Sequence, residues 1–348
     1  MCPRRTSSQW ALSGPPGVTT NNKPRAACRG VRAIGYAATE DRLRRGGIVL
    51  LDGGTGTELQ RRGVAMDPQA WCGPAALAHA GVLEEVHRAY IAAGADVITA
   101  NTFASSRLML EPAGFADRFE EINRTAVATA HRARDASGRP DVLVAGSLSH
   151  MCPIVRGVAQ PDLTRRPSIA AMAEAFAELA LLLRDEGCDL ILLEMMYDPR
   201  RLGPALDAAM QTGLPVWAGF SARRGAGGEV LSYLPEEDIP FADLVQGLAA
   251  PDVAAAGVMH SSADVTSDAI AVLRDVYRGP LMAYPDSGYF RMPEWQFEDV
   301  IPPPELLRFA TAWVDTGVQI VGGCCGLSPE HIAALEPLKD RVPHRRRL

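Results

Sequence analysis

Eight short runs rich in Val, Ile, Leu and Ala recur along the chain, and each stops at a glycine, a polar residue or a charged residue. The runs are apolar throughout instead of alternating with polar residues, which is typical of strands buried on both faces of a parallel sheet. Stretches with a helical period separate neighbouring runs. The predicted strands are Ile48–Asp52, Asp96–Ala100, Val142–Gly146, Leu190–Glu194, Val216–Phe220, Ala254–Met259, Leu281–Tyr284 and Val318–Gly322.

Eight strands alternating with helices over about 300 residues fit a (β/α)₈ barrel in both number and length. Two of the intervening helices are predicted over Val82–Ala93 and Ile169–Glu186, where apolar residues fall on one face. The alternative is an open, doubly wound sheet, which needs a glycine-rich dinucleotide fingerprint after an early strand. Gly53-Gly54-Thr55-Gly56 follows the first strand but lacks that spacing. We therefore predict a single α/β domain of the TIM-barrel class.

The net charge of −6 argues against a general nucleic-acid-binding surface. Seven cysteines without a regular spacing argue against a disulfide scaffold and favour a reducing, cytoplasmic location. No apolar run is long enough to span a bilayer. We expect small-molecule partners, with neither nucleic acid nor membrane among them, and a homo-oligomer is compatible with the sequence.

The first 39 residues contain several arginines and many Ser and Thr, but neither Asp nor Glu. They show no helical or strand period, so we predict a disordered basic extension over residues 1–40 and the barrel over residues 41–348. An organelle-targeting segment has a similar composition and is the alternative interpretation.

Barrel enzymes place their chemistry at the carboxyl ends of the strands. Two adjacent cysteines, Cys324 and Cys325, follow the last predicted strand between glycines. Neighbouring side chains of a strand point to opposite faces, but glycine permits the turns that would bring both thiols to one point. A thiophilic metal such as zinc is the natural occupant, although two small buried cysteines that only pack are the simpler alternative.

A third zinc ligand is expected at the end of another strand. His260 ends the sixth predicted strand, and a His/Cys/Cys set with an open fourth position is the form of a catalytic zinc site. His150 and Cys152, after the third strand, are rival third ligands. A histidine that is only hydrogen-bonded remains the alternative for His260.

Four motifs resemble, in the right order, those of the homocysteine S-methyltransferase family. They are Leu51-Asp52-Gly53-Gly54-Thr55-Gly56-Thr57-Glu58-Leu59, the run from Ala93 to Phe103, Ile191-Leu192-Leu193-Glu194-Met195, and Gly322-Gly323-Cys324-Cys325-Gly326 followed by Pro329-Glu330-His331-Ile332. The last is the most specific, and together the four cover nearly all of residues 41–338.

The resemblance implies a (β/α)₈ barrel with Zn²⁺ at its mouth, held in part by Cys324 and Cys325. It also implies that Glu194 and Asp52 act in catalysis by holding the amino group of the substrate. The backbone of Gly53 and Gly54 would receive the substrate carboxylate, because a glycine-rich turn exposes N–H groups to an anion. Asn101, at the end of the second strand, completes the predicted substrate site.

The sequence departs from the family at three strand ends. The sixth strand of the family ends in Asn-Cys, which supplies the third zinc ligand, whereas Met259-His260 stands here. The family's Tyr-Pro-Asn is Tyr284-Pro285-Asp286, and the Gly-Pro that usually follows the third strand is Ser149-His150. Imidazole in place of thiolate would make the metal more Lewis-acidic by one unit of charge.

The predicted activity is zinc-dependent methyl transfer from a sulfonium or ammonium donor to the thiolate of homocysteine, or of a similar thiol, giving methionine. One alternative is a zinc-binding barrel without transferase activity that sequesters metal or thiol, and another is a redox protein that uses the cysteine pair. Tyr284, Tyr289, Phe290 and Trp295 are candidates to offer aromatic faces to a cationic donor, and ordinary packing around a loop is the alternative.

Overall fold

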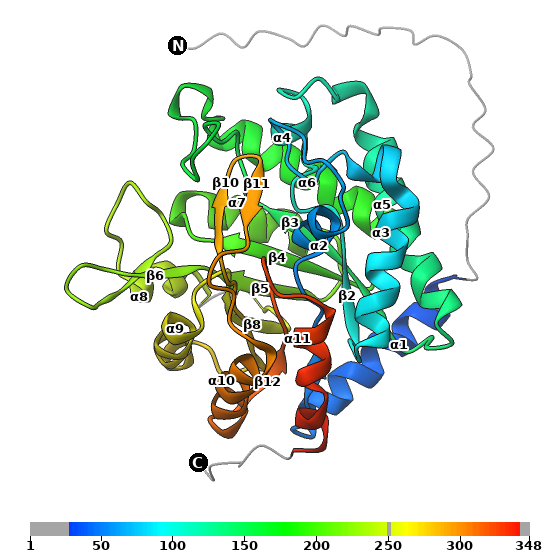
Figure 1. Cartoon of the computed structure of the whole chain (residues 1–348), viewed down its shortest axis with the longest axis vertical. Coiled ribbons are helices and arrows are strands. Elements are labelled where there is room, and N and C mark those ends of the chain that lie inside the picture. The colour runs from blue at the N-terminus through cyan, green and yellow to red at the C-terminus, as the bar shows by residue number, and fades with distance from the viewer. Residues whose placement is uncertain (1–27, 249–251, 342–348) are drawn as a thin grey trace, which may run out of the picture.

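The computed structural model describes residues 28–248 and 252–341 and shows eight parallel strands surrounded by helices (Figure 1). The strands lie in the order β1-β12-β9-β8-β5-β4-β3-β2. A bridge between Leu51 and Val97, with the Asp52 N–H donating to the Val97 carbonyl at 3.0 Å, joins β1 to β2 and closes the ring. The strands are β1 (Val49–Leu50), β2 (Val97–Ala100), β3 (Leu143–Ser149), β4 (Leu190–Met196), β5 (Val216–Phe220), β8 (Ala255–Met259), β9 (Leu281–Tyr284) and β12 (Val318–Val321).

The fold is therefore the predicted (β/α)₈ barrel, and the open doubly wound sheet is excluded. Outside the ring lie the helices α1 (Cys28–Arg44), α2 (Thr55–Arg61), α3 (Ala75–Ala92), α4 (Arg107–Leu110), α5 (Phe119–Ala136), α6 (Ile169–Asp185), α7 (Pro199–Met210), α8 (Phe241–Val245), α9 (Ala263–Val276), α10 (Pro303–Asp315) and α11 (Pro329–Ala334). Two antiparallel hairpins were not predicted, namely β6 (Ala222–Arg224) with β7 (Val230–Ser232), and β10 (Tyr289–Arg291) with β11 (Glu294–Gln296).

Each predicted run overlaps one strand of the barrel, and the differences lie at the ends. Strands β3 and β4 continue beyond the predicted Gly146 and Glu194, because Ser149 of β3 pairs with Glu194 and Met196 of β4 pairs with Phe220. Strand β1 is shorter than predicted, because its chain turns away at Asp52 toward α2.

The apolar runs supply two cores, as strands buried on both faces require. Leu190 and Leu192 of β4 pack inside the barrel, whereas Ile191 and Leu193 pack outward against the helices. This alternation of period two places Glu194 on the inner face, at the mouth. The register of the strand thus directs a carboxylate into the barrel opening.

Helix α1 covers the end of the barrel opposite the mouth. The indole N–H of Trp217, which fills the barrel interior, donates to the Tyr36 hydroxyl at 3.0 Å. The Gln319 side-chain amide donates to the Leu43 carbonyl at 2.5 Å. Residues 28–40, which we expected in a disordered extension, therefore form most of α1, while residues 1–27 lie outside the described chain. The sequence did not predict this helix, because the helix is held by contacts with the end of the barrel opposite the mouth and not by an apolar period of its own.

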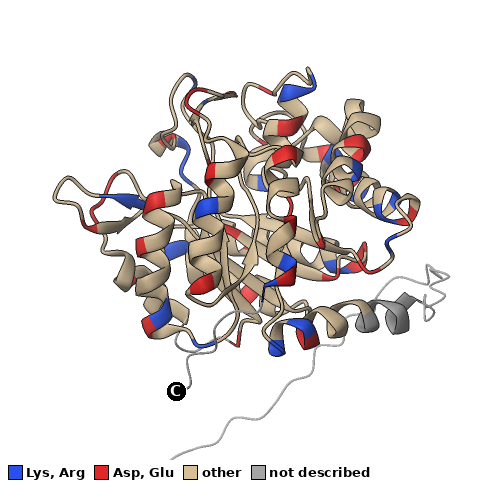
Figure 2. Cartoon of the chain, turned by 60° about the horizontal axis from the view of Figure 1, so that its bottom comes forward, with Lys and Arg blue, Asp and Glu red and all other residues tan. Residues whose placement is uncertain are grey.

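Acidic and basic residues are interleaved along the outer helices (Figure 2). Ion pairs join neighbouring helices, such as Arg132 to Glu84 at 2.7 Å and Arg107 to Glu178 at 2.5 Å. Each exposed pair of this kind contributes at most about 1 kcal/mol to stability. Within the described residues, every helix is too short or too polar to cross a membrane.

Candidate functional site

The turn after β12 brings the two adjacent cysteines together. Gly326 has φ +82°, and a Cβ atom there would collide with the Ser287 carbonyl, so the turn requires glycine. The Cys324 N–H donates to the Pro285 carbonyl at 2.7 Å, and the Cys325 carbonyl accepts from the Ser287 N–H at 3.0 Å. The two Sγ atoms lie 3.9 Å apart.

His260 lies beside this pair. It follows β8 in a left-handed conformation, with φ +43°, and its Nδ1 lies 3.7 Å from Cys324 Sγ. The Asp286 carboxylate lies 3.6 Å from the same nitrogen. Among the described residues, His260, Cys324 and Cys325 form the only group of three His, Cys, Asp or Glu ligand atoms that all lie within 4.8 Å of one another. The rival ligands His150 and Cys152 are not part of this group.

The cysteine thiols and the imidazole of this cluster must lose protons before they can bind a metal. The contact with Cys325 and burial both raise the pKa of Cys324 well above its usual value. Burial lowers the pKa of His260, but the nearby Asp286 carboxylate and Cys324 sulfur outweigh it and raise that pKa to about 9. A metal that binds here must displace these protons, so its affinity rises with pH.

A small cavity of about 60 Å³, the acceptor cavity, opens beside the cluster. The structure brings every predicted site residue to its wall. These residues are Asp52, Gly53, Gly54, Asn101, Glu194, His260, Cys324 and Cys325.

The two carboxylates of the acceptor cavity are held by hydroxyl groups and backbone. Glu194 Oε2 accepts from the Ser147 hydroxyl. Asp52 accepts from the Thr99 N–H at 2.6 Å and from its hydroxyl at 2.8 Å. Burial raises the pKa of both Asp52 and Glu194 to about 7. Such buried carboxylates gain most from a cationic partner, since a positive charge restores the ionised form.

The glycine turn and Asn101 complete the wall. Gly53 and Gly54 pack against Leu327 and the cysteine turn. The Gly54 N–H, which was predicted to help receive the substrate carboxylate, instead donates to the Leu327 carbonyl at 3.3 Å. The first turn of α2, which follows, presents N–H groups that have no partner within a helix. The Asn101 side-chain amide donates to the Cys72 carbonyl at 2.9 Å, which fixes its orientation.

A second, larger cavity of about 330 Å³, the aromatic cavity, adjoins the first and shares His260 and Cys325 with it. Eight rings line it in a continuous chain, in which neighbouring ring centres lie 4.4–6.3 Å apart. In order along this chain they are Phe103, Trp71, Phe290, Trp295, His260, Tyr233, Tyr197 and His150.

Two of the four aromatic residues singled out in the sequence, Phe290 and Trp295, line this cavity. Tyr284 instead lines the acceptor cavity, and Tyr289 is 37% exposed and lines neither. Sequence reasoning missed Trp71 and Tyr233 because they lie in loops after different strands. Only closure of the barrel brings such loops together.

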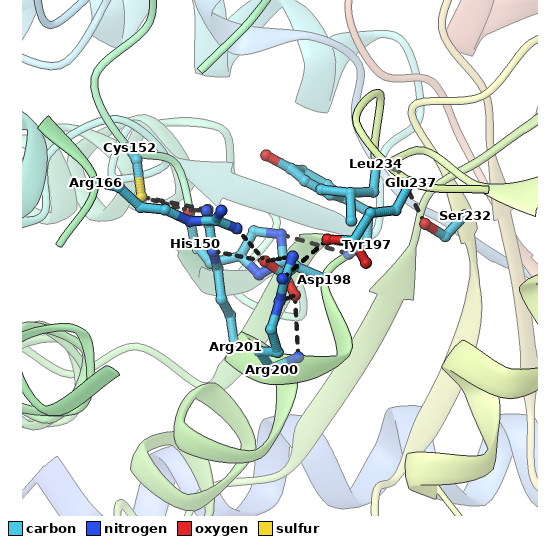
Figure 3. Close-up of polar contacts among 10 residues, drawn as sticks. All are labelled: His150, Cys152, Arg166, Tyr197, Asp198, Arg200, Arg201, Ser232, Leu234 and Glu237. Atoms are coloured by element: carbon cyan, nitrogen blue, oxygen red, sulfur yellow. Dashed lines mark hydrogen bonds and ion pairs between the residues drawn. The ribbon is translucent and has the colours of Figure 1, made fainter. Parts of the chain in front are cut away.

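A buried ion network forms the wall behind His150 (Figure 3). Asp198, fully buried before α7, pairs with Arg166, Arg200 and Arg201 at 2.8–3.3 Å. Arg201 also donates to the His150 carbonyl at 3.2 Å and to Cys152 Sγ at 3.3 Å. The network therefore fixes the segment after β3, and Cys152 serves in that wall.

Comparison with known proteins agrees with this geometry. The family model for homocysteine S-methyltransferase matches residues 49–338. The chain belongs to the homocysteine S-methyltransferase family. Family membership makes it a methyltransferase of EC class 2.1.1, in a group that methylates thiols and their selenium analogues.

Its relatives include enzymes with two named acceptors. The homocysteine S-methyltransferase of Escherichia coli (strain K12) is 30% identical over 307 residues, which cover 83% of this chain and 94% of the relative. The selenocysteine Se-methyltransferase of Brassica oleracea var. italica is 24% identical over 326 residues, covering 86% and 91%. The crystal structure of the E. coli homocysteine methyltransferase MmuM in its metallated form has a TM-score of 0.67, at 23% identity, and covers 87% of this chain and 99% of that one.

Proposed function

We propose that this family member transfers a methyl group from a sulfonium or quaternary ammonium donor to the thiolate of homocysteine, giving methionine, with zinc held by His260, Cys324 and Cys325. One observation carries the proposal. Of the three ligand residues, His260 and Cys325 line the wall that the acceptor cavity and the aromatic cavity share, and Cys324 lines the acceptor cavity beside them. An acceptor in one cavity and a donor in the other would meet there.

The residues fit zinc. Tetrahedral zinc with bonds of about 2.0–2.3 Å separates its ligand atoms by roughly 3.4–3.8 Å. The sulfur–sulfur distance is 3.9 Å and the sulfur–nitrogen distance is 3.7 Å. Three protein ligands leave a fourth position for the substrate sulfur. When bound, zinc would keep that sulfur ionised at neutral pH, where a free thiol is mostly protonated.

The position of Asp286 supports imidazole as the third ligand. Replacing a thiolate by neutral imidazole removes one negative charge from the site, and Asp in place of the family's Asn adds one 3.6 Å from the ring nitrogen. Asp286 lies beside the same ring nitrogen that faces Cys324, so its carboxylate would act through its charge and not as a partner of the other ring nitrogen. The two departures from the family thus compensate each other in charge.

The acceptor would be held by its amino acid end. Glu194 and Asp52 face the acceptor cavity and would pair with its ammonium group. The Gly53 backbone, together with the N–H groups of the first turn of α2, would receive its carboxylate. These contacts leave the thiol end directed toward Cys324, Cys325 and His260.

The donor would occupy the aromatic cavity. Aromatic faces attract a sulfonium or quaternary ammonium group, and Tyr233 and Trp295 are the rings in contact with His260, at 5.3 and 5.7 Å. In the transfer, the acceptor sulfur forms the new S–C bond as the bond from methyl to the onium atom breaks. The bonding electrons remain with the donor, which leaves as a neutral sulfide or amine, and the thiolate becomes a neutral thioether.

Metal analysis and a product assay test the proposal. The purified full-length protein is expected to hold about one zinc per chain, and the Cys324→Ala, Cys325→Ala double variant is expected to lose it. Cys188→Ala, which removes a buried cysteine outside both cavities, is the matched control. Full zinc occupancy in the double variant, or no methionine from homocysteine with any onium donor, would overturn the proposal.

A further inference from the structure

We infer that the methyl donor is an onium carboxylate without a free amino group, and that Arg223 selects it by binding the carboxylate. This inference rests on the proposed function and specifies the chemistry of the aromatic cavity. Among the described residues that line this cavity, Arg223 is the only Lys or Arg, and none is Asp or Glu. The cavity therefore offers aromatic faces for a cation and one guanidinium, that of Arg223, for an anion, although Asp238 already pairs with one of its nitrogens.

The acceptor cavity shows how this chain receives an ammonium group. There, two carboxylates, Asp52 and Glu194, line about 60 Å³. The aromatic cavity is several times larger and lacks any such group on its described wall. An amino acid donor would carry an ammonium group into this cavity without an anionic partner, and one missing charged hydrogen bond weakens binding by about 10- to 100-fold.

Four acidic residues near the aromatic cavity already have partners, and Glu236, which lies near Tyr197, is exposed and does not line the cavity. Asp198 lies behind the wall with three arginines (Figure 3). Glu237 pairs with Arg200 at 2.9 Å, and Asp238 pairs with Arg223 at 2.6 Å. Asp286 contacts His260 and lines neither cavity. None of these carboxylates is positioned to receive a donor ammonium.

Hydrogen bonds from two of its nitrogens fix the Arg223 side chain at the cavity wall. Its Nη2 donates to Asp238 and to the carbonyls of Leu234 and Glu237, and its Nε donates to the Leu234 carbonyl at 3.4 Å. These bonds use Nε and Nη2, and we assign Nη1 to the donor carboxylate. The same hairpin carries Tyr233, whose ring contacts His260. A donor that spans from Tyr233 to Arg223 would have its onium group near the metal ligands and its carboxylate farther away.

A matched pair of donors tests the inference. S-methylmethionine and 4-(dimethylsulfonio)butanoate share the sulfonium group, the chain length and the carboxylate, and differ only in the amino group. With full-length zinc-loaded protein and saturating homocysteine, kcat/KM for methionine formation is expected to favour the amine-free donor by at least about 10-fold. Calorimetric binding of each donor, without homocysteine, is expected to show the same preference.

Variants test the role of Arg223. Arg223→Gln should lower affinity for 4-(dimethylsulfonio)butanoate about 10-fold or more and leave affinity for its methyl ester unchanged. Arg223→Lys should restore part of the loss. Asp238→Asn removes the ion pair but keeps the guanidinium, so it should preserve the preference between the two donors. Circular dichroism and thermal melting check that each variant is folded.

The outcomes separate the two proposals. If methionine forms but S-methylmethionine binds as tightly as its amine-free analogue, the donor class is wrong and the proposed function stands. If Arg223→Gln binds both donors as the wild type does, Arg223 is not the carboxylate site. If the amine-free donor binds more tightly but neither donor yields methionine, the donor preference stands and the proposed methyl transfer fails.

Discussion

Glu194→Gln gives the sharpest test of how the acceptor binds. The Ser147 hydroxyl holds Glu194 Oε2, so Oε1 is the oxygen left to accept from a substrate ammonium. Both oxygens of Asp52 already accept from Thr99, so Glu194 provides most of the charged contact. Glutamine keeps the shape and an acceptor for Ser147 but loses the charge. The loss of one charged hydrogen bond costs about 1.5–3 kcal/mol, which raises the KM for homocysteine by about 10- to 150-fold.

The assay compares two acceptors at a fixed donor concentration. Homocysteine carries the amino group, and 4-mercaptobutanoate lacks it. Glu194→Gln should raise the KM for homocysteine but leave that for 4-mercaptobutanoate nearly unchanged. Ser147→Ala, which keeps the charge, should cost only about 0.5–1.5 kcal/mol. Zinc content should be unchanged in both variants. An unchanged KM for homocysteine, or an equal effect on both acceptors, would refute the role given to Glu194.

The pH dependence follows from the same carboxylates. Burial raises the pKa of Glu194 and Asp52 to about 7, so both are largely neutral below that pH and ionised above it. Only the ionised form pairs with the ammonium. The ratio of kcat/KM for homocysteine to that for 4-mercaptobutanoate should therefore rise as pH increases from 6 to 8. In Glu194→Gln this rise should be much smaller.

Three further changes probe the metal ligands and the barrel floor. Cys324→Ala and His260→Ala should each weaken zinc binding by about 100-fold or more, as judged by competition with a chelator, because each removes one of three ligands; unchanged affinity would exclude the residue as a ligand. His260→Cys should retain zinc, and its cobalt-substituted form should show stronger sulfur-to-metal charge-transfer absorption than the wild type, whereas an identical spectrum would contradict ligation at this position. Tyr36→Phe should lower the free energy of unfolding in urea by about 1–3 kcal/mol, because the buried indole N–H of Trp217 loses its acceptor; no loss would show that α1 does not depend on this contact.

Much of the barrel follows from local pattern. The limits of β5 and β9 match the predicted runs, because each run is apolar and ends where the backbone leaves the ring. The period of two along β4 is also enough to direct Glu194 inward. The gathering of His260, Cys324 and Cys325 could be predicted because each stands at the end of a strand, and all such ends meet at one mouth.

Other features depend on contacts between segments far apart in the chain. Helix α1 is held by Tyr36 against Trp217, 181 residues away, and nothing in its own composition indicates that contact. The aromatic cavity is similar, since Trp71 and Trp295 come from opposite ends of the barrel sequence. Their rings line one cavity only after the ring of strands has closed.

The pairing of β12, the last strand of the chain, with β1 determines when the proposed zinc could be captured. The cysteine turn follows β12, and the Gly323 N–H donates to the Asp52 carbonyl at 3.0 Å, so the proposed ligands pack on the turn that leaves the first strand. During synthesis, the earlier strands emerge and begin to fold before residues 318–325 exist. A nascent chain therefore presents no thiolate pair to the cellular zinc pool until the last strand is added. Metal loading would then report that the ring is complete, and a chain arrested before β12 would compete for no zinc at this site.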